Sequence, residues 1–281
     1  AVLVRLACSD DGTTVVAEVM ENYADTVIFV QQDNGEFLSI SEDWKGAFTY
    51  VDTLNGELIF LTQAQAPLGR LIAVKQGQTL AEGRTLVEEC DMKLEEAIRH
   101  GDQLVLFYLK DAASLVRVVS VDGKKAYDLP LPSALGACTL AMQNGRAIRK
   151  SDSLILEFES FVHSPMLLKL NGDELTVLYQ PNPKTAEDIE VRQIFTEAPD
   201  GERIPAFVVM PKALEKTGRT PTLMYGYGGY NNAILPSYNN PFVDLDIVDW
   251  VSQGRIYVSI NLRGGSEYGT RWHEGGSLAN K

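Results

Sequence analysis

Short apolar runs that stop at glycine turns follow one another through the first two thirds of the chain. Each of four such runs ends at a glycine that a polar residue follows, and these are Gly35, Gly77, Gly123 and Gly172. Further turn glycines stand just ahead of other apolar runs, and these are Gly12, Gly56 and Gly101. Within each series the spacing is roughly 40 to 50 residues, the repeat length of several β-rich folds. The pattern therefore predicts a repeated unit of short strands.

Each repeat has the composition of paired strands joined by tight turns. The runs are rich in β-branched and aromatic residues, which strands favour, and Asn-Gly or Asp-Gly closes several of them. Two strands and two turns within one period are what a β-propeller blade needs. An antiparallel sandwich with coincidental spacing is the alternative. Long helical patterns are scarce, and the best helical candidate is the short run MKLEEAI at residues 92–98.

The pattern changes after a polar stretch with two prolines between residues 180 and 188. Two strands flank the turn APDGER, and an apolar strand then runs into the glycines of YGYGG. Helical spacing and a final glycine predict a helix over residues 239–254, before a second apolar strand that ends in Arg-Gly-Gly. Strand, helix and strand predict a crossover in a mixed or parallel sheet. Ligands of such sheets bind beyond the carboxyl ends of the strands, where both glycine clusters lie.

The glycine clusters match none of the common catalytic or cofactor-binding motifs. A phosphate-binding loop is absent, and Asn231 takes the third glycine position of a dinucleotide fingerprint. Neither Ser266 nor Ser277 stands in a GxSxG nucleophile elbow. The three histidines, His100, His163 and His273, have no metal-ligand spacing and suggest no Ser-His-acid triad within the chain. We therefore expect no cofactor and no metal.

Alternating glycine and tyrosine can serve a different chemistry. Glycines let the backbone turn tightly, so that a tyrosine hydroxyl is held where it can donate a hydrogen bond to a developing oxyanion. Neighbouring aromatic rings can form an apolar slot for a substrate side chain. The simpler alternative is a tight turn with buried tyrosines.

Composition narrows the partners. The chain has 281 residues and a net charge of −13, so we expect no nucleic-acid partner. Its three cysteines, Cys8, Cys90 and Cys138, form no CxxC pair, which favours a reducing compartment. We expect the cytoplasm, with the periplasm as the alternative, and no membrane partner because the apolar runs are short. The opening lacks an initiator methionine and reads like the middle of a β protein, so we expect a segment of a longer polypeptide.

Three motifs near the end of the chain together carry a family resemblance. In the order YGYGGYN, NLRGGSEYG and WHEGGSLANK, they resemble the prolyl oligopeptidase family of serine peptidases, and ESFVHSP looks like that family's final-blade segment. Members pair a seven-bladed β-propeller with an α/β-hydrolase domain. The resemblance implies a mixed fold. Residues 1–184 would supply about four C-terminal blades, and residues 185–281 the N-terminal part of the hydrolase domain.

The resemblance also implies site residues. Tyr227, the second tyrosine of YGYGG, would donate its hydroxyl to the oxyanion hole. Tyr230, where the family commonly has phenylalanine, would line the proline-binding pocket. His273 belongs to the WHEGG motif and would not be the catalytic base. The nucleophile, the acid and the histidine of the family all lie beyond LANK, so the resemblance implies that these residues alone are inactive.

Taken together, the resemblance implies a serine endopeptidase that cleaves short peptides on the carboxyl side of proline through an acyl-enzyme. Its expected partners are short proline-containing peptides and the remainder of the same polypeptide. Two alternatives stay open. One is a peptidase similar to oligopeptidase B, which cuts after basic residues. The other is an inactive peptide-binding propeller that carries a remnant of a hydrolase domain.

Overall fold

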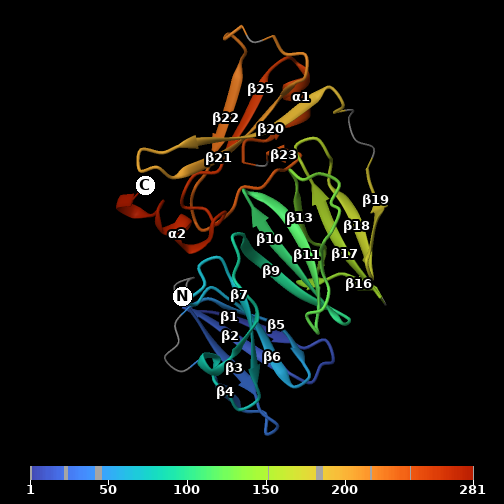
Figure 1. Ribbon diagram of the computed structural model, residues 1–281, viewed down its shortest axis with the longest axis vertical. Coiled ribbons are helices and arrows are strands. Elements are labelled where there is room, and N and C mark those ends of the chain that lie inside the picture. Colours follow the sequence, from blue (N-terminus) through green and yellow to red (C-terminus); the bar gives the residue numbers. More distant parts are fainter. Residues whose placement is uncertain are drawn as a thin grey trace. The chain divides into compact units, whose positions relative to one another are not determined.

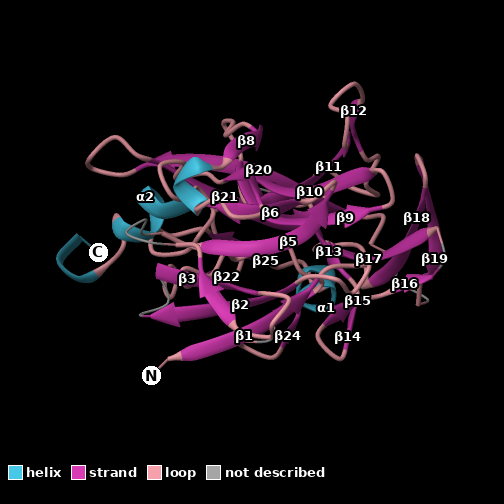
Figure 2. Ribbon diagram, turned by 90° about the horizontal axis from the view of Figure 1, so that it is seen from below, coloured by secondary structure: helices cyan, strands magenta, loops and turns pink. Residues whose placement is uncertain are grey.

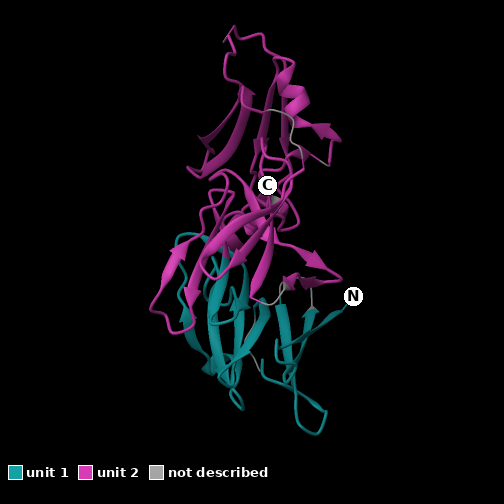
Figure 3. Ribbon diagram, turned by 90° about the vertical axis from the view of Figure 1, so that its right-hand side faces the viewer, with its two compact units in different colours: residues 1–106 teal, residues 107–281 magenta. Residues whose placement is uncertain are grey.

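The computed structural model describes residues 2–21, 25–41, 46–150, 152–181, 186–215, 217–240 and 242–280 (Figure 1). Nearly all of its regular structure is strand, with a few short helices near the end of the chain (Figure 2). The chain divides into two compact units, residues 1–106 and residues 107–281, which Figure 3 colours separately.

Four sheets of meandering strands follow one another along the chain. The first contains β1 (Leu3–Cys8), β2 (Val15–Glu21), β3 (Asp25–Gln31) and β4 (Phe37–Ser39). The second contains β5 (Phe48–Leu54), β6 (Glu57–Thr62), β7 (Arg70–Lys75) and β8 (Arg84–Val87), with the short helix η1 (Leu80–Glu82) before β8. The third contains β9 (Lys93–His100), β10 (Gln103–Lys110), β11 (Ala113–Ser120) and β12 (Ala126–Asp128). Four consecutive sheets confirm the predicted blades.

The fourth sheet is interrupted by a small hairpin. Its strands are β13 (Ala137–Leu140), β17 (Ser153–Glu159), β18 (Met166–Asn171) and β19 (Glu174–Tyr179), and β16 (Arg149–Lys150) also pairs with β17. The hairpin between β13 and β16 consists of β14 (Met142–Gln143) and β15 (Arg146–Ala147). These neighbouring strands pair in antiparallel fashion.

The turn glycines adopt the backbone conformation that the sequence pattern predicts. All seven have φ between +58° and +85°, a region that other residues enter only at a steric cost. A Cβ added at any of them would meet no atom within 4 Å. These positions therefore need glycine for its conformational freedom and not for its small size.

The predicted helix near MKLEEAI is wrong, because residues 93–100 form strand β9. Glutamate, lysine and alanine favour a helix in isolation, but their propensities are small and tertiary context overrides them. Here β9 is an edge of the third sheet beside β10, and it buries Leu94 and Ile98. Pairing with the apolar β10 decides its conformation.

The core of the first unit lies between the first two sheets. Its buried members come from β2, β3, β5, β6 and β7, with Ile40, Ala64 and Leu80 from the connections. Phe48, Phe60 and Leu80 are at most 1% exposed. At about 25 cal/mol per Å² of buried apolar surface, side chains of this kind supply most of the stabilisation of such a unit.

A buried carboxylate connects the first hairpins of three successive sheets. Asp52, which is 2% exposed, accepts a hydrogen bond from the backbone N–H of Asp10 at 3.0 Å. Its other oxygen lies 3.2 Å from the guanidinium of Arg99, which also donates to the carbonyls of Thr53 and Gly101. Since a buried charge requires a partner, Arg99 holds the three hairpins in register with one another.

We expect Arg99→Gln to lower the free energy of unfolding by about 2 kcal/mol, because it leaves the Asp52 carboxylate buried beside a neutral group. Urea denaturation of the two proteins measures the difference. The matched control is Arg192→Gln, which removes an ion pair whose arginine side chain is 51% exposed and should therefore change the free energy of unfolding far less. Equal losses in the two variants would contradict a special role for Asp52.

The last part of the chain forms a mixed sheet with strand order β20-β21-β25-β22. These strands are β20 (Ile189–Glu197), β21 (Arg203–Pro211), β22 (Thr222–Gly226) and β25 (Ile256–Ile260). Between β22 and β25 the chain forms β23 (Asn239–Asn240), β24 (Leu245–Asp246) and helix α1 (Ile247–Ser252), and after β25 come α2 (Gly269–Glu274) and η2 (Leu278–Asn280). Because β22 and β25 are parallel and β21 and β25 antiparallel, the predicted crossover in a mixed sheet is confirmed.

The crossover helix is shorter than predicted. It begins after Asp246, whose side chain accepts the backbone N–H of Asp249 at 2.9 Å, as an N-cap does. The residues before it form the small β23–β24 hairpin, in which Asp244 has a φ of +46° that no helix allows. The apolar spacing of the first half of this segment therefore does not belong to a helix.

Tips of the third and fourth sheets pack into the core beside the mixed sheet. The buried members of this cluster are Ala112, Ala113, Phe161, Ile189, Phe207, Val209, Tyr238, Ile247, Val248, Val251 and Tyr257. Phe161, from the ESFVHSP motif, lies 5.5 Å from Phe207 and 6.0 Å from Tyr257 between ring centroids. Each aromatic pair of this kind contributes roughly 0.5–1.5 kcal/mol beyond its buried area, so this cluster holds the tips of the two sheets against the mixed sheet.

Candidate functional site

The three glycine motifs meet in a single backbone junction. A Cβ placed on Gly228 would lie 2.6 Å from the carbonyl oxygen of Arg263, and one on Gly264 would lie 2.3 Å from the carbonyl oxygen of Gly228. A Cβ on Gly276 would lie 2.1 Å from the carbonyl carbon of Arg263. Real Cβ atoms do not approach backbone so closely, so glycine is required here to let the three loops touch. We call these loops, residues 226–229, 263–265 and 275–276, the glycine junction.

Hydrogen bonds to Gly264 fix the junction. Its carbonyl accepts the backbone N–H of Asn231 at 3.0 Å, and its own N–H donates to the carbonyl of Trp272 at 3.0 Å. The Nδ1 of His273 lies 2.9 Å from the same carbonyl oxygen and must carry the proton, since a carbonyl can only accept. His273 therefore serves as an anchor for the loop.

Two buried side chains hold the segment that follows YGYGGYN. Glu267 and Asn261 are 1% and 0% exposed. One carboxyl oxygen of Glu267 accepts the N–H of Ile234 at 3.0 Å and the amide of Asn261 at 3.2 Å, and that amide also donates to the carbonyl of Ile234 at 2.6 Å. Both polar backbone groups of Ile234 are thus held by side chains of the loop after β25. The sequence reasoning missed this contact because nothing local predicts it.

Burial raises the pKa of the Glu267 carboxyl above its ordinary value of 4.5, although hydrogen bonds from Ile234 and Asn261 partly oppose the shift. The folded protein then holds this proton more tightly than the unfolded chain does. Its contribution to stability is complete below the unfolded pKa and is lost as pH rises through the folded pKa.

We therefore expect Glu267→Gln, which keeps an oxygen for Ile234 and cannot ionise, to remove one source of pH dependence. From about pH 4.5 upward, the free energy of unfolding of the unmodified protein should fall relative to that of the variant. Urea denaturation at several pH values measures this difference, and the other buried carboxyls cancel because both proteins contain them. Parallel curves over the whole range would contradict a raised pKa at this residue.

Tyr227 and Tyr230 come together at the exposed side of the glycine junction. Their rings stack with centroids 6.3 Å apart, and the Tyr227 ring also stacks on Phe242 at 5.7 Å. Tyr227 is half-buried, whereas Tyr230 is 85% exposed. Tyr230 and Asn231 both have a φ of +55°, which is an outlier for so bulky a side chain as tyrosine. Strained backbone of this kind concentrates at functional sites.

This arrangement can hold a phenol still while leaving its surroundings open. Tyr227 follows directly from β22, and the next residue, Gly228, is fixed against the carbonyl of Arg263. Phe242 also stacks on Tyr225, with ring centroids 5.8 Å apart. The contact of Phe242 with these tyrosines was not predicted from the sequence, because Phe242 lies within the segment that was predicted to be a helix.

The remaining serines and histidines singled out from the sequence have structural roles. Ser266 is 1% exposed, and the Ser277 hydroxyl donates to the carbonyl of His273 at 2.8 Å. His163 pairs with Ser160, a contact that the sequence reasoning did not raise, at 2.8 Å. The oxygen of Ser160 also accepts two backbone N–H groups and is 1% exposed, so this pair closes a turn. His100 is the last residue of β9.

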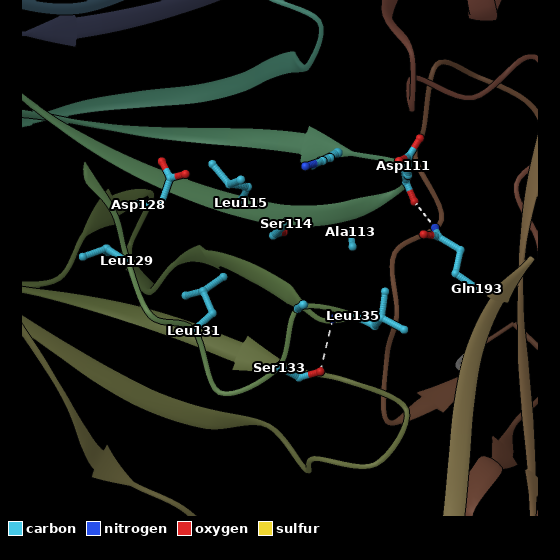
Figure 4. A pocket seen from close by; sticks show the side chains of 12 residues that line it. Asp111, Ala113, Ser114, Leu115, Asp128, Leu129, Leu131, Ser133, Leu135 and Gln193 are labelled. Carbon is cyan, nitrogen blue, oxygen red and sulfur yellow. Dashed lines mark hydrogen bonds between the residues drawn. The ribbon is translucent and has the colours of Figure 1, made fainter. Parts of the chain in front are cut away.

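A cavity of about 400 Å³ lies elsewhere in the second unit (Figure 4). Leucines from β11 and the connection to β13 form much of its wall, and Gln193 of β20 borders it on one side. Next to it, Asp111 accepts a hydrogen bond from the Tyr268 hydroxyl at 2.8 Å, and its carbonyl accepts one from Gln193. Neither Tyr227 nor Tyr230 lines this cavity. It is therefore a feature of the blade-to-sheet contact and not of the tyrosine loop.

The described residues offer neither a metal site nor a membrane-spanning helix. No three histidine, cysteine, aspartate or glutamate side chains among them gather as a metal site would require. None of the helices in this described part is long and apolar enough to cross a membrane.

Comparisons with known proteins agree with the sheet architecture. A family model described as the prolyl oligopeptidase N-terminal beta-propeller domain matches residues 1–178. The prolyl endopeptidase of Dictyostelium discoideum is 30% identical over 260 residues, which are 86% of this chain and 33% of that protein. The prolyl endopeptidase of Elizabethkingia meningoseptica is 27% identical over 252 residues, which are 88% of this chain and 34% of that protein. The chain thus spans about a third of the length of these relatives.

Solved structures of similar proteins extend the likeness to nearly the whole chain. A prolyl endopeptidase studied for inter-domain dynamics is 28% identical with a TM-score of 0.85, over 99% of this chain and 40% of that one. Oligopeptidase B from Leishmania major has a TM-score of 0.81 at 17% identity, over 98% of this chain and 40% of that one, and shares the fold. Because the family model covers more than half of the chain and a relative at 30% identity covers 86% of it, the chain belongs to the prolyl oligopeptidase family and comprises an N-terminal propeller segment.

Proposed function

We propose that this chain is a segment of a serine endopeptidase that hydrolyses short peptides on the carboxyl side of proline. In this proposal residues 1–184 are propeller blades and residues 185–281 begin the α/β-hydrolase domain. The observation that carries it is the Tyr227 phenol, held at the glycine junction between two aromatic rings. Membership of a family of peptidases and the names of the relatives support the reaction class.

Tyr227 stabilises the transition state of acyl transfer in this mechanism. A serine from another part of the full polypeptide attacks the carbonyl carbon of the proline residue while a histidine takes the serine proton, and the carbonyl oxygen gains negative charge as the tetrahedral intermediate forms. The Tyr227 hydroxyl donates a hydrogen bond to that oxygen. A donor that is already in place stabilises the transition state most, because it need not move or reorient as the charge develops. The glycine junction supplies that rigidity.

Tyr230 contributes to substrate binding in the same proposal. Its ring is exposed beside that of Tyr227, and an aromatic face packs well against the compact apolar pyrrolidine ring of proline. The expected partners are short proline-containing peptides and the rest of the same polypeptide. The expected location is the cytoplasm, with the periplasm as the alternative.

The test uses the full-length gene product with two reporter peptides, one with proline and one with arginine before the cleaved bond. The proposal expects kcat/KM to be higher for the proline reporter by a factor of at least about 100, the discrimination that roughly 3 kcal/mol of binding provides. A preference for arginine would support an activity like that of oligopeptidase B instead.

An inactive peptide-binding propeller is the second candidate, and a serine-reactive phosphonate probe separates the two. The peptidase proposal expects labelling of the full-length product, while a peptide-binding module binds the peptides and takes no label. The 281-residue chain alone should stay unlabelled, because neither Ser266 nor Ser277 stands in a GxSxG nucleophile elbow. Labelling at either residue would contradict the assigned roles.

A further inference from the structure

Phe242 occupies an unusual place for an apolar side chain. It is 63% exposed, yet its ring lies parallel to two tyrosine rings, within 13° of Tyr225 and 16° of Tyr227. With Tyr230 next to Tyr227, four aromatic rings form one continuous stack. Parallel rings whose centroids lie 5.7 Å apart are offset from one another, which is an arrangement that aromatic pairs prefer, so Phe242 packs beside the Tyr227 ring.

The backbone of Phe242 is fixed from the core. Its N–H donates to the side-chain oxygen of Asn240 at 3.0 Å, and the amide of Asn240 donates to the hydroxyl of Tyr257 at 2.8 Å. Asn240 and Tyr257 are 4% and 2% exposed. An exposed ring is thus attached to a buried hydrogen-bonded pair, which limits its movement more than exposure alone would suggest.

We propose that Phe242 is a positioning residue that sets the direction of the Tyr227 hydroxyl by stacking on its ring. The proposal rests on the oxyanion role given above to Tyr227. Rotation of the Tyr227 side chain about its Cα–Cβ bond moves the hydroxyl oxygen, and Gly228 restrains only the backbone. Phe242 on one side and Tyr230 on another restrict that rotation, so the hydroxyl points in one direction before substrate arrives. A misplacement of about 1 Å in such a group can cost on the order of 100-fold in rate.

A passive packing role predicts different behaviour. If Phe242 merely stabilised the hairpin, removing its ring would lower stability and leave the Tyr227 ring in place. If it touched the substrate, its removal would raise KM. A positioning role predicts a lower kcat with KM little changed, because only the alignment of the transition-state donor is lost.

The first measurement uses the full-length peptidase with ¹³C-labelled tyrosine rings, and Tyr227→Phe assigns the resonance. Phe242→Ala should move the Tyr227 ring signals, because a neighbouring ring no longer shields them, and Phe242→Tyr should restore their positions. The matched control is Phe37→Ala, since Phe37 is also an exposed phenylalanine, 42% accessible, in the first sheet. Unmoved Tyr227 signals in Phe242→Ala overturn the proposal.

The second measurement uses the full-length peptidase. Phe242→Ala should lower kcat about tenfold with KM nearly constant, the range expected for a partial loss of an oxyanion donor, and Phe242→Tyr should recover it. In a Tyr227→Phe background, Phe242→Ala should cost almost nothing more, because both changes act through one hydroxyl. Full additivity of the two substitutions, or an increase confined to KM, overturns the positioning role.

The two proposals fail in different ways. Full activity of Tyr227→Phe would overturn the oxyanion role itself, and with it the catalytic consequence given to Phe242. A slow Tyr227→Phe enzyme beside a fully active Phe242→Ala enzyme would overturn the positioning role alone.

Discussion

Replacing Tyr227 with phenylalanine in the full-length peptidase is expected to lower kcat by about 10²- to 10³-fold, or roughly 2.7–4 kcal/mol of transition-state stabilisation. The substitution removes one oxygen and keeps the ring, so the stack with Phe242 and Tyr230 can persist. KM should change little, because the hydrogen bond forms to an oxygen that becomes charged only in the transition state.

The control for this change is Tyr225→Phe, two residues earlier. It also removes a phenol oxygen, here from the Tyr225 ring, which stacks on Phe242. Tyr225 has no place in the proposed mechanism, so kcat should stay within about twofold of the parent value, inside the range of non-specific effects for surface changes. A Tyr227→Phe enzyme with the same kcat as this control would remove the basis of the proposed function.

Gly264→Ala is expected to destabilise the glycine junction by forcing its backbone apart. At φ +105° an alanine is strained by roughly 1–2 kcal/mol. Its Cβ would also lie 2.3 Å from the Gly228 carbonyl oxygen, so the two loops must separate, and overpacking of this kind costs about 1–3 kcal/mol more. We expect a total loss of roughly 2–5 kcal/mol in the free energy of unfolding of the second unit, measured by urea denaturation.

Gly254→Ala is the matched control, since Gly254 has φ +80° and a Cβ there would meet nothing within 4 Å. It should show the conformational strain alone, about 1–2 kcal/mol. In the full-length peptidase, Gly264→Ala should also lower kcat, because Asn231 bonds to Gly264 in the loop that carries Tyr230. Equal effects of the two alanines would show that close contact at the glycine junction is unimportant.

Much of the fold could be predicted from the sequence, because it depends on conformations that neighbouring residues impose. Each turn glycine before or after a blade strand is required by a positive φ, and that φ depends only on the two or three residues of the turn. Gly201 also has a positive φ, in the turn between the antiparallel strands β20 and β21, and this turn was predicted for the same reason. The parallel pairing of β22 with β25 followed from the order of strand, helix and strand, because a crossover connection leaves few alternatives.

The errors share a different cause. Residues 93–100 have helical propensity and form a strand, since the neighbouring strand outweighs propensities of a few tenths of a kcal/mol per residue. The segment 239–246 has apolar spacing suited to a helix and forms a hairpin, in which the buried Asn240 side chain donates a hydrogen bond to the Tyr257 hydroxyl of β25. In both places a contact with residues outside the segment decided its conformation.

By itself, the sequence determined the repeat of short strands, the positions of their turns and the three motifs of the prolyl oligopeptidase family, because each depends on residues adjacent in the chain. Only the tertiary structure decided that the three glycine motifs form one junction, that Glu267 and Asn261 hold Ile234, and that Phe242 stacks on Tyr227. These contacts join residues that lie far apart along the chain. Their energies depend on distances and ring orientations that arise only when β22, β25 and the loops between them pack together.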